Sequence, residues 1–170
     1  MLKPAQLYQT ELNEKFIGIW YDPEYMYYTF SSGFSTLDFV DNNYNSHSFA
    51  CLDKSNNIIG FISYDIHPAT MSVDNLAILS FDKGNIIFGR DLKQVIYDIF
   101  NKYHMNRLEF QCIAGNPSFE SYKRITKRYG GSIVGHCHDC VKLIDGRLHD
   151  LYTFEIMAAD FSSLYYSVTL

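Results

Sequence analysis

The pattern of hydrophobic and polar residues changes near residue 48. Before it, apolar residues recur at roughly helical spacing from Leu7 to Ile19. Asp22-Pro23 then breaks this run and can start another helix, which carries aromatic residues as far as Phe30. We therefore expect residues 1–45 to form aromatic-rich N-terminal helices with irregular connections.

Beyond residue 48 the pattern predicts strands. Two of them are SFACLD at 48–53 and IIGFISYDI at 58–66, and the four polar residues between them predict a hairpin. A third strand is MSVDNLAILSF at 71–81. Its mostly apolar end is typical of a central strand that is covered on both faces.

The helix after Gly89 is the clearest predicted element. Its apolar residues occupy positions i, i+3, i+4, i+7 and i+8 and form one continuous stripe: Leu92, Val95, Ile96, Ile99 and Phe100. The next elements are a strand, RLEFQCI at 107–113, and a helix over Ser118–Tyr129. Two further strands, at 132–144 and 148–156, flank Asp145-Gly146-Arg147 and predict a terminal hairpin with a compact turn.

The order of these elements predicts the fold class. Helices, hairpin, strand, helix, strand, helix and hairpin follow one another, which favours an α/β (α+β) architecture. We expect a central mixed, mostly antiparallel sheet of six to seven strands with helices on both faces. A length of 170 residues favours a single domain over 1–170, with the sheet core at 48–157.

Composition narrows the classes of function. A formal charge of −5 argues against general nucleic-acid binding, which depends on basic residues. No apolar run approaches membrane-spanning length, and residues 1–10 lack the pattern of a signal peptide, so we expect a cytoplasmic protein with no membrane partner. The four cysteines are expected to be reduced: Cys51, Cys112, Cys137 and Cys140.

The stretch from Gly84 to Gly131 suggests a ligand. A glycine turn opens one helix, and after the next strand Asn116-Pro117 opens another. A helix N-terminus beside a glycine offers unpaired N–H groups and a positive dipole end, which suit phosphate. Two such helix starts, each after a strand, favour a diphosphate cofactor with a long arm.

This organisation resembles the acyl-CoA-binding half of the GCN5-related N-acetyltransferase (GNAT) superfamily, and the order of elements matches that family over roughly 48–157. The closing IDGRLHD at 144–150 also resembles the DG-x-x-x-D ending of one of its branches. The resemblance implies acetyl-CoA as cofactor. It also implies an amine-bearing acceptor, either a small molecule or a protein, that enters between the N-terminal helices and the terminal hairpin.

The resemblance assigns cofactor contacts to the central strand and to both helix starts: Ile78, Leu79, Phe88, Gly89, Arg90, Asp91, Asn116 and Ser118. Gly89 takes the last position of the family's phosphate-loop pattern, with Ile87 and Gly84 at the other two signature positions. Plain local roles stay open as alternatives. Gly89 can be only a turn residue, Arg90 only a solvated one, and Asn116 only a helix cap.

Two catalytic roles follow from the same resemblance. Tyr122 is the candidate general acid that protonates the departing thiolate, and packing on an amphipathic helix is its alternative role. Asp74 is the candidate general base, because a partly buried carboxylate can have a raised pKa. Asp65 and His67 are rival bases, and a one-residue change in strand register would exchange the groups that face the site.

The segment His136–Cys140 looks like a metal or redox site. Its Cys-x-x-Cys has no second pair to complete four ligands, and His149 is the only obvious helper downstream. On a regular strand, Cys137 and Cys140 would also point to opposite faces. We therefore predict no metal, and a metal or redox protein stays the third hypothesis. The second hypothesis is a non-catalytic GNAT-fold module, which binds CoA or, through a tyrosine-rich surface, a protein partner. A homodimer also stays open.

Overall fold

The computed structural model describes residues 1–20, 22–27 and 42–161. Its strands are β1 (Leu2–Pro4), β2 (Ser46–Leu52), β3 (Ile58–His67), β4 (Ser72–Ser80), β5 (Arg107–Ile113), β6 (Ser132–Lys142) and β7 (Leu148–Met157). Its helices are α1 (Gln9–Ile19), α2 (Ile86–Asn101), α3 (Phe119–Arg128) and the 3-10 helices η1 (Ala5–Tyr8) and η2 (Pro23–Tyr25). No helix within these ranges is long and apolar enough to cross a bilayer.

One seven-stranded sheet organises the chain, with the strand order β1-β2-β3-β4-β5-β7-β6. Neighbouring strands pair antiparallel except β4 and β5, which are parallel. This confirms the predicted mixed, mostly antiparallel sheet. It also confirms β4 as a central strand, with three strands on each side.

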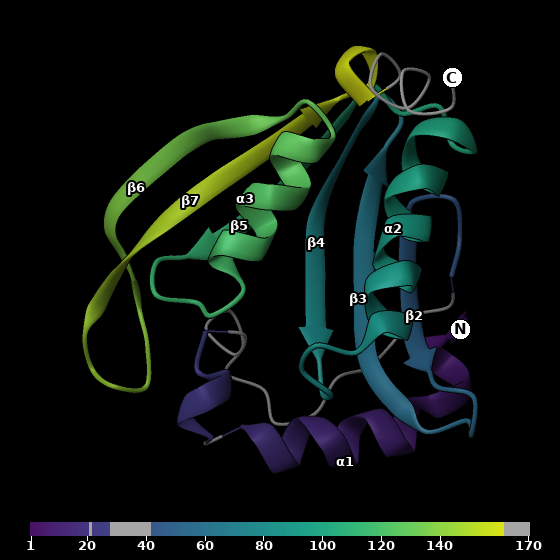
Figure 1. Ribbon diagram of the computed structural model, residues 1–170, viewed down its shortest axis with the longest axis vertical. Helices are drawn as coiled ribbons and strands as arrows, with labels where there is room; N and C mark the ends of the chain where they lie inside the picture. The colour runs from purple at the N-terminus through teal and green to yellow at the C-terminus, as the bar shows by residue number, and fades with distance from the viewer. Residues whose placement is uncertain (21, 28–41, 162–170) are drawn as a thin grey trace.

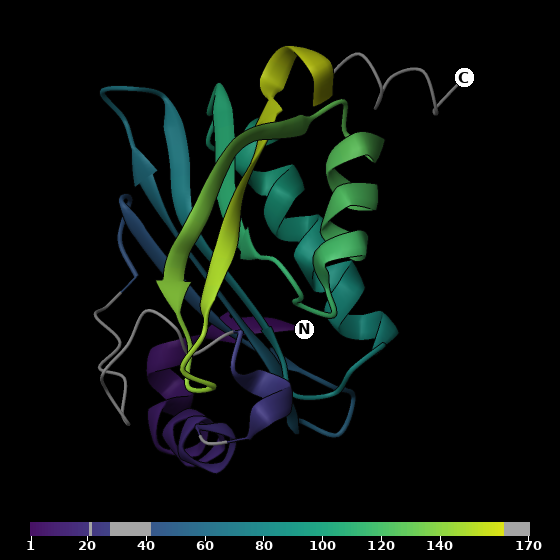
Figure 2. The ribbon, with the colours of Figure 1, turned by 90° about the vertical axis from the view of Figure 1, so that its left-hand side faces the viewer.

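Helices cover both faces of the sheet, as the sequence predicts (Figures 1 and 2). The stripe of α2 packs in one core cluster with Ile62 and Tyr64 of β3, and Tyr122 of α3 joins the same cluster. Leu12 of α1 belongs to a second cluster with Phe61. Because successive residues of a strand point to opposite faces, α1 lies on the face opposite α2 and α3.

The N-terminal region differs from the expected helices. Residues 2–4 form an edge strand that pairs with β2, because their extended backbone meets the open edge of that strand. The expected second helix is only the 3-10 turn of η2, whose start is capped by the Asp22 side chain, which accepts from Glu24 N. Met26 and Tyr27 follow it as a turn, and residues 28–30 of that predicted helix lie outside the described residues.

Helix α2 begins at Ile86, three residues before Gly89, which corrects the predicted start. Asn85 caps the helix, since its side-chain oxygen accepts hydrogen bonds from Ile87 N and Phe88 N. Gly89 therefore lies within the first turn, and its own N–H donates to the Asn85 carbonyl at 3.1 Å. The turn before the helix carries the glycine with positive φ, Gly84 at +81°.

Candidate functional site

Strands β4 and β5 pair at one end only and then separate. Their register is Ser72 with Arg107 and Val73 with Leu108, and no further pair forms between these two described strands. Asn75, just beyond, has φ +51°, and the β3–β4 register shifts at the same level. Residues 75–80 of β4, which include Ile78 and Leu79, thus face β5 without a strand partner on that side.

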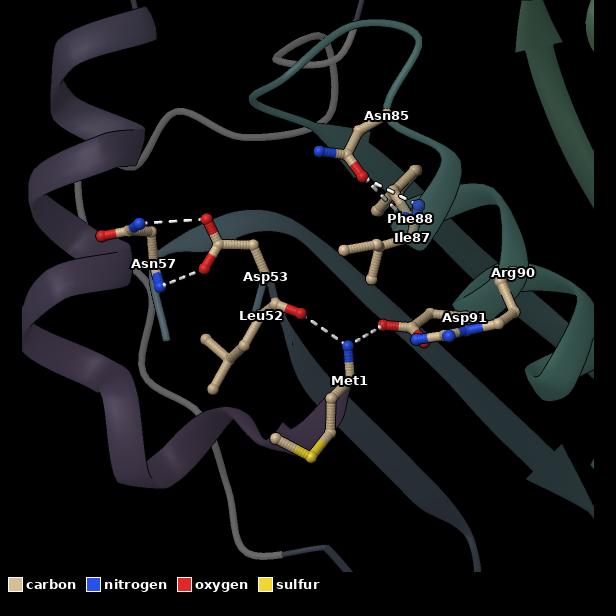
Figure 3. A network of polar contacts seen from close by, with 9 residues as sticks. All are labelled: Met1, Leu52, Asp53, Asn57, Asn85, Ile87, Phe88, Arg90 and Asp91. Carbon is tan, nitrogen blue, oxygen red and sulfur yellow. Dashed lines mark hydrogen bonds and ion pairs between the residues drawn. The ribbon is translucent and has the colours of Figure 1, made fainter. Parts of the chain in front are cut away.

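The start of α2 lies at the far end of β4 and presents amides that are already bonded. Asn85 Oδ1 lies 2.8 Å from Ile87 N and 3.3 Å from Phe88 N, as Figure 3 shows. Its amide nitrogen donates to Asp82 Oδ2 at 2.7 Å. The Phe88 ring is buried against Gly60, so Phe88 anchors α2 on β3. A phosphate at this helix end would have to replace the Asn85 oxygen.

Asp91, one turn into α2, is buried and binds the start of the chain. The amino group of Met1 lies 2.5 Å from Asp91 Oδ2 and 2.6 Å from the Leu52 carbonyl oxygen (Figure 3). Arg90 beside it is exposed, with its guanidinium 3.8 Å from Asp91 Oδ1. Asp91 therefore ties α2 to β1 and β2, whereas the Arg90 side chain beside it is a positive charge open to solvent.

The second helix start combines capping with a close aromatic contact. Asn116 is buried, and its side-chain oxygen accepts from Ser118 N at 2.8 Å. The Ser118 side chain makes no capping bond. Gly115 has φ +89°, and a Cβ there would lie 2.8 Å from the Tyr27 hydroxyl. Tyr27 also contacts His149 edge-to-face at 6.0 Å, so the N-terminal region meets the terminal hairpin beside this loop.

Tyr122 lies on α3 and faces the sheet. It is 8% exposed, and its ring meets Phe110 of β5 edge-to-face with centroids 5.7 Å apart. Phe110 is the fourth residue of β5 and lies beyond the last residue paired with β4, Leu108. Tyr122 is thus beside the separated part of β5, on the face covered by α2 and α3.

Asp74 is the first residue of β4 beyond the last one paired with β5, Val73. Its Oδ1 lies 2.8 Å from His67 Nε2, and its side chain is 43% exposed. The rival base Asp65 is its cross-strand partner and accepts from Asn75 Nδ2 at 2.9 Å. The structure therefore brings all three candidate bases together at the point where the strands separate.

Carboxylates from four neighbouring strands share the sheet face opposite α2 and α3: Asp65, Asp74, Glu109 and Glu155. Leu108 and Phe110 belong to the core under the helices, which places Glu109 between them on the other face. Arg107 pairs with Glu109 and lies 3.0 Å from Glu155 Oε2. The sequence interpretation missed Glu109 and Glu155, although strand alternation alone would have placed both off the apolar face.

The comparisons with known proteins come from structure alone. No family model matches the chain, and no curated protein matches it by sequence. A chimera of the spermidine N-acetyltransferase SpeG from Vibrio cholerae and hSSAT superposes with a TM-score of 0.68 at 16% identity, over 96% of this chain and 98% of that one.

Two further structures agree with this result. Spermidine/spermine N-acetyltransferase SpeG from Vibrio cholerae gives a TM-score of 0.58 at 15% identity, over 90% of this chain and 76% of that one. A GCN5-related N-acetyltransferase from Brucella melitensis gives 0.56 at 18% identity, over 71% of this chain and 54% of that one. The chain therefore has the fold of the GCN5-related N-acetyltransferases.

Proposed function

We propose that the chain is an acyl-CoA-dependent N-acyltransferase that transfers an acetyl group from acetyl-CoA to a primary amine. The observation that carries this proposal is the separation of β4 from β5 beyond Val73 and Leu108. It leaves the backbone edge of β4 open within the sheet, and it lies between the starts of α2 and α3. The likeness in fold to N-acetyltransferases supports the same activity.

The open edge of β4 fits the amide-bearing arm of the cofactor. An extended chain of amides can pair with an unpaired strand edge as an added strand does, and residues 75–80 offer such an edge. At the diphosphate end, the N–H groups of Ile87 and Phe88 are the donors, and Asn85 has to release them. Arg90 adds a solvent-exposed positive charge beside them. When bound, acetyl-CoA supplies the activated acyl group and a thiolate leaving group.

The acceptor enters from the opposite face of the sheet. The row of carboxylates there gives a negative potential that attracts a cationic amine, and Arg107 and His67 offset only part of it. Asp74 lies where the strands separate, so it is placed to take the proton that the attacking amine loses. Tyr122 lies on the other face, where its hydroxyl can protonate the departing thiolate.

The test is thiol release from acetyl-CoA by the full chain with a panel of amines, including diamines, polyamines and peptides with a free amino group. The proposal expects an amine-dependent rate that exceeds the rate of hydrolysis without amine. It expects Asp74→Asn and Tyr122→Phe each to reduce this rate while folding is retained. No amine-dependent rate across the panel contradicts catalysis.

The second candidate is a non-catalytic module of the same fold. The capped amides at Asn85 and the pairing of Asp74 with His67 favour it, because both engage groups that catalysis would use. Binding of CoA without any turnover is the outcome that this candidate expects. If CoA does not bind, the remaining version of this candidate is a module that binds a protein partner.

A further inference from the structure

The segment His136–Cys140 does not run as a regular strand. The β6–β7 register shifts between Cys137 and Val141, and Asp139 within the shift has φ +48°. Three residues of β6 therefore bulge away from the ladder. The expectation that Cys137 and Cys140 point to opposite faces assumes a regular strand, which this segment is not. His136 and His138, two residues apart, reach the same partner on β7.

That partner is the carboxylate of Asp150. His136 Nε2 donates to Asp150 Oδ2 at 2.8 Å, and His138 Nδ1 donates to Oδ1 at 2.7 Å. The N–H of Asp139 also donates to Oδ1, at 3.0 Å. The two imidazole nitrogens and the carboxylate oxygen all lie within 4.8 Å of one another.

We propose that His136, His138 and Asp150 form a binding site for one divalent transition-metal ion, with Zn²⁺ as the reference ion. Two imidazoles and a carboxylate are a ligand set that such ions use, with a fourth position left for water. Tetrahedral zinc with these ligands needs donor atoms about 3.4 Å apart, so the three groups need to move only slightly. On binding, a neutral histidine moves the proton that bonds Asp150 to its other ring nitrogen, whereas a protonated histidine releases that proton to solvent, so that each ligating nitrogen is free for the ion.

The surroundings hold two of the three ligands in place before an ion arrives. The His136 ring stacks on Tyr152 with centroids 4.5 Å apart and an interplanar angle of 4°. Asp150 lies on β7, which pairs on both sides, and its carbonyl accepts from Ala114 N at 2.8 Å. The third ligand, His138, is 77% exposed, so an ion from solvent can reach it.

The metal would join the bulge of β6 to β7, because it takes two ligands from one strand and one from the other. This predicts that Zn²⁺ raises the melting temperature, since a ligand that binds only the folded state stabilises it. The inference does not depend on acyl transfer. Its first competitor is a carboxylate that only anchors the bulge by hydrogen bonds. The second is a site built on the neighbouring thiols of Cys137 and Cys140, where Cys140 Sγ donates to the Cys137 carbonyl oxygen at 3.4 Å.

The test is titration of the full chain, free of any affinity tag, with Zn²⁺ against a chromophoric chelator, together with metal analysis after dialysis. We expect one ion per chain. His138→Ala should weaken binding at least about tenfold, because loss of a ligand costs no less than loss of a supporting hydrogen bond. His104→Asn is the control, since His104 is an exposed histidine between α2 and β5 and should leave Zn²⁺ affinity unchanged.

Two more variants separate the competitors. The double variant Cys137→Ser and Cys140→Ser should keep the ion, and loss of binding there would assign the site to the thiols and overturn the proposal. Asp150→Asn should also lose the ion, with circular dichroism to verify that it folds. Less than one ion per ten chains in the parent protein, or unchanged affinity in His138→Ala, likewise overturns it.

Discussion

The side-chain oxygen of Asn85 lies 2.8 Å from the N–H of Ile87, so a residue of the chain holds the helix end that a cofactor diphosphate would need. Asn is among the best N-cap residues, and this bond satisfies donors that are otherwise unpaired. The same bond makes the two roles of this helix end separable. A substitution can keep the cap and repel phosphate, or remove the cap and leave the amides free.

Asn85→Asp should weaken the binding of CoA and keep the helix cap, at some cost in stability because the new carboxylate replaces the amide that donates to Asp82. An aspartate caps a helix as well as asparagine does, and its charge is favourable at the helix N-terminus. The same charge repels a diphosphate from the N–H groups of Ile87 and Phe88. Isothermal titration with CoA and thermal melting of the same sample measure the two effects.

Asn85→Ala is the matched variant. It should lower the free energy of unfolding by about 1 kcal/mol through the lost cap, and it should bind CoA at least as well as the parent because the amides are free. Equal CoA affinity in the parent, Asn85→Asp and Asn85→Ala would show that the diphosphate does not bind at this helix end.

Tyr122→Phe should reduce kcat by about 100-fold, which is the lower range for loss of a general acid. The phenyl ring keeps the edge-to-face contact with Phe110, so the fold and CoA affinity should change little. Steady-state kinetics with the best amine of the panel gives kcat, and CoA titration is the control. A variant with parental kcat would leave Tyr122 with a packing role only.

Gly60→Ala and Gly89→Ala should change stability in opposite directions. A Cβ on Gly60 would lie 2.3 Å from the Phe88 ring and 2.7 Å from the Leu79 carbonyl oxygen, and such overpacking costs about 1–3 kcal/mol. A Cβ on Gly89 meets nothing within 4 Å, and alanine in a helix gains about 0.5–1 kcal/mol over glycine. Urea unfolding measures both, and a neutral Gly60→Ala would contradict the close approach of α2 to β3.

His47 should make the protein less stable in mild acid. Burial lowers the pKa of His47, although a hydrogen bond with the Tyr44 carbonyl opposes this. The unfolded chain therefore takes up this proton more readily, so stability is complete above an unfolded pKa of about 6.5 and is lost as the pH falls below it.

The comparison variant for this effect is His47→Phe, which keeps an aromatic ring stacked on Tyr64. Between pH 7 and pH 5 its free energy of unfolding should fall less than that of the parent. The other titrating groups are common to both proteins, so the difference isolates His47. Parallel pH profiles would rule out a contribution from this residue.

Periodic patterns predicted most of the fold. The stripe of α2 and the alternating strands on either side were predicted because each buries one face, and burial dictates the residue type at every position there. The edge strand at residues 2–4 could not be predicted, since three residues carry no period and their structure depends on pairing with β2. The prediction misplaces the start of α2 because the sequence offers two glycines, and Gly84, with positive φ, is the turn glycine while Gly89 lies within the helix.

The site was less predictable because it depends on contacts between distant segments. Asp74, Asp65 and His67 were identified individually, but only the pairing of β3 with β4 brings them together. The burial of Asp91 against Met1 joins residues 90 positions apart, and no local pattern signals it. The bulge at Asp139 has no signal in the local pattern either, and it brings the Asp139 N–H and the His138 ring to the same carboxylate as His136.

The most direct test of the central claim is calorimetric titration of the full chain with acetyl-CoA and, separately, with CoA. The account predicts a saturable one-to-one isotherm for acetyl-CoA, with Kd in the range of about 1 µM to 1 mM that is usual for enzyme substrates. It also predicts clearly weaker binding by Asn85→Asp that has been verified to fold. No binding of either ligand at millimolar concentration by folded protein would contradict the account.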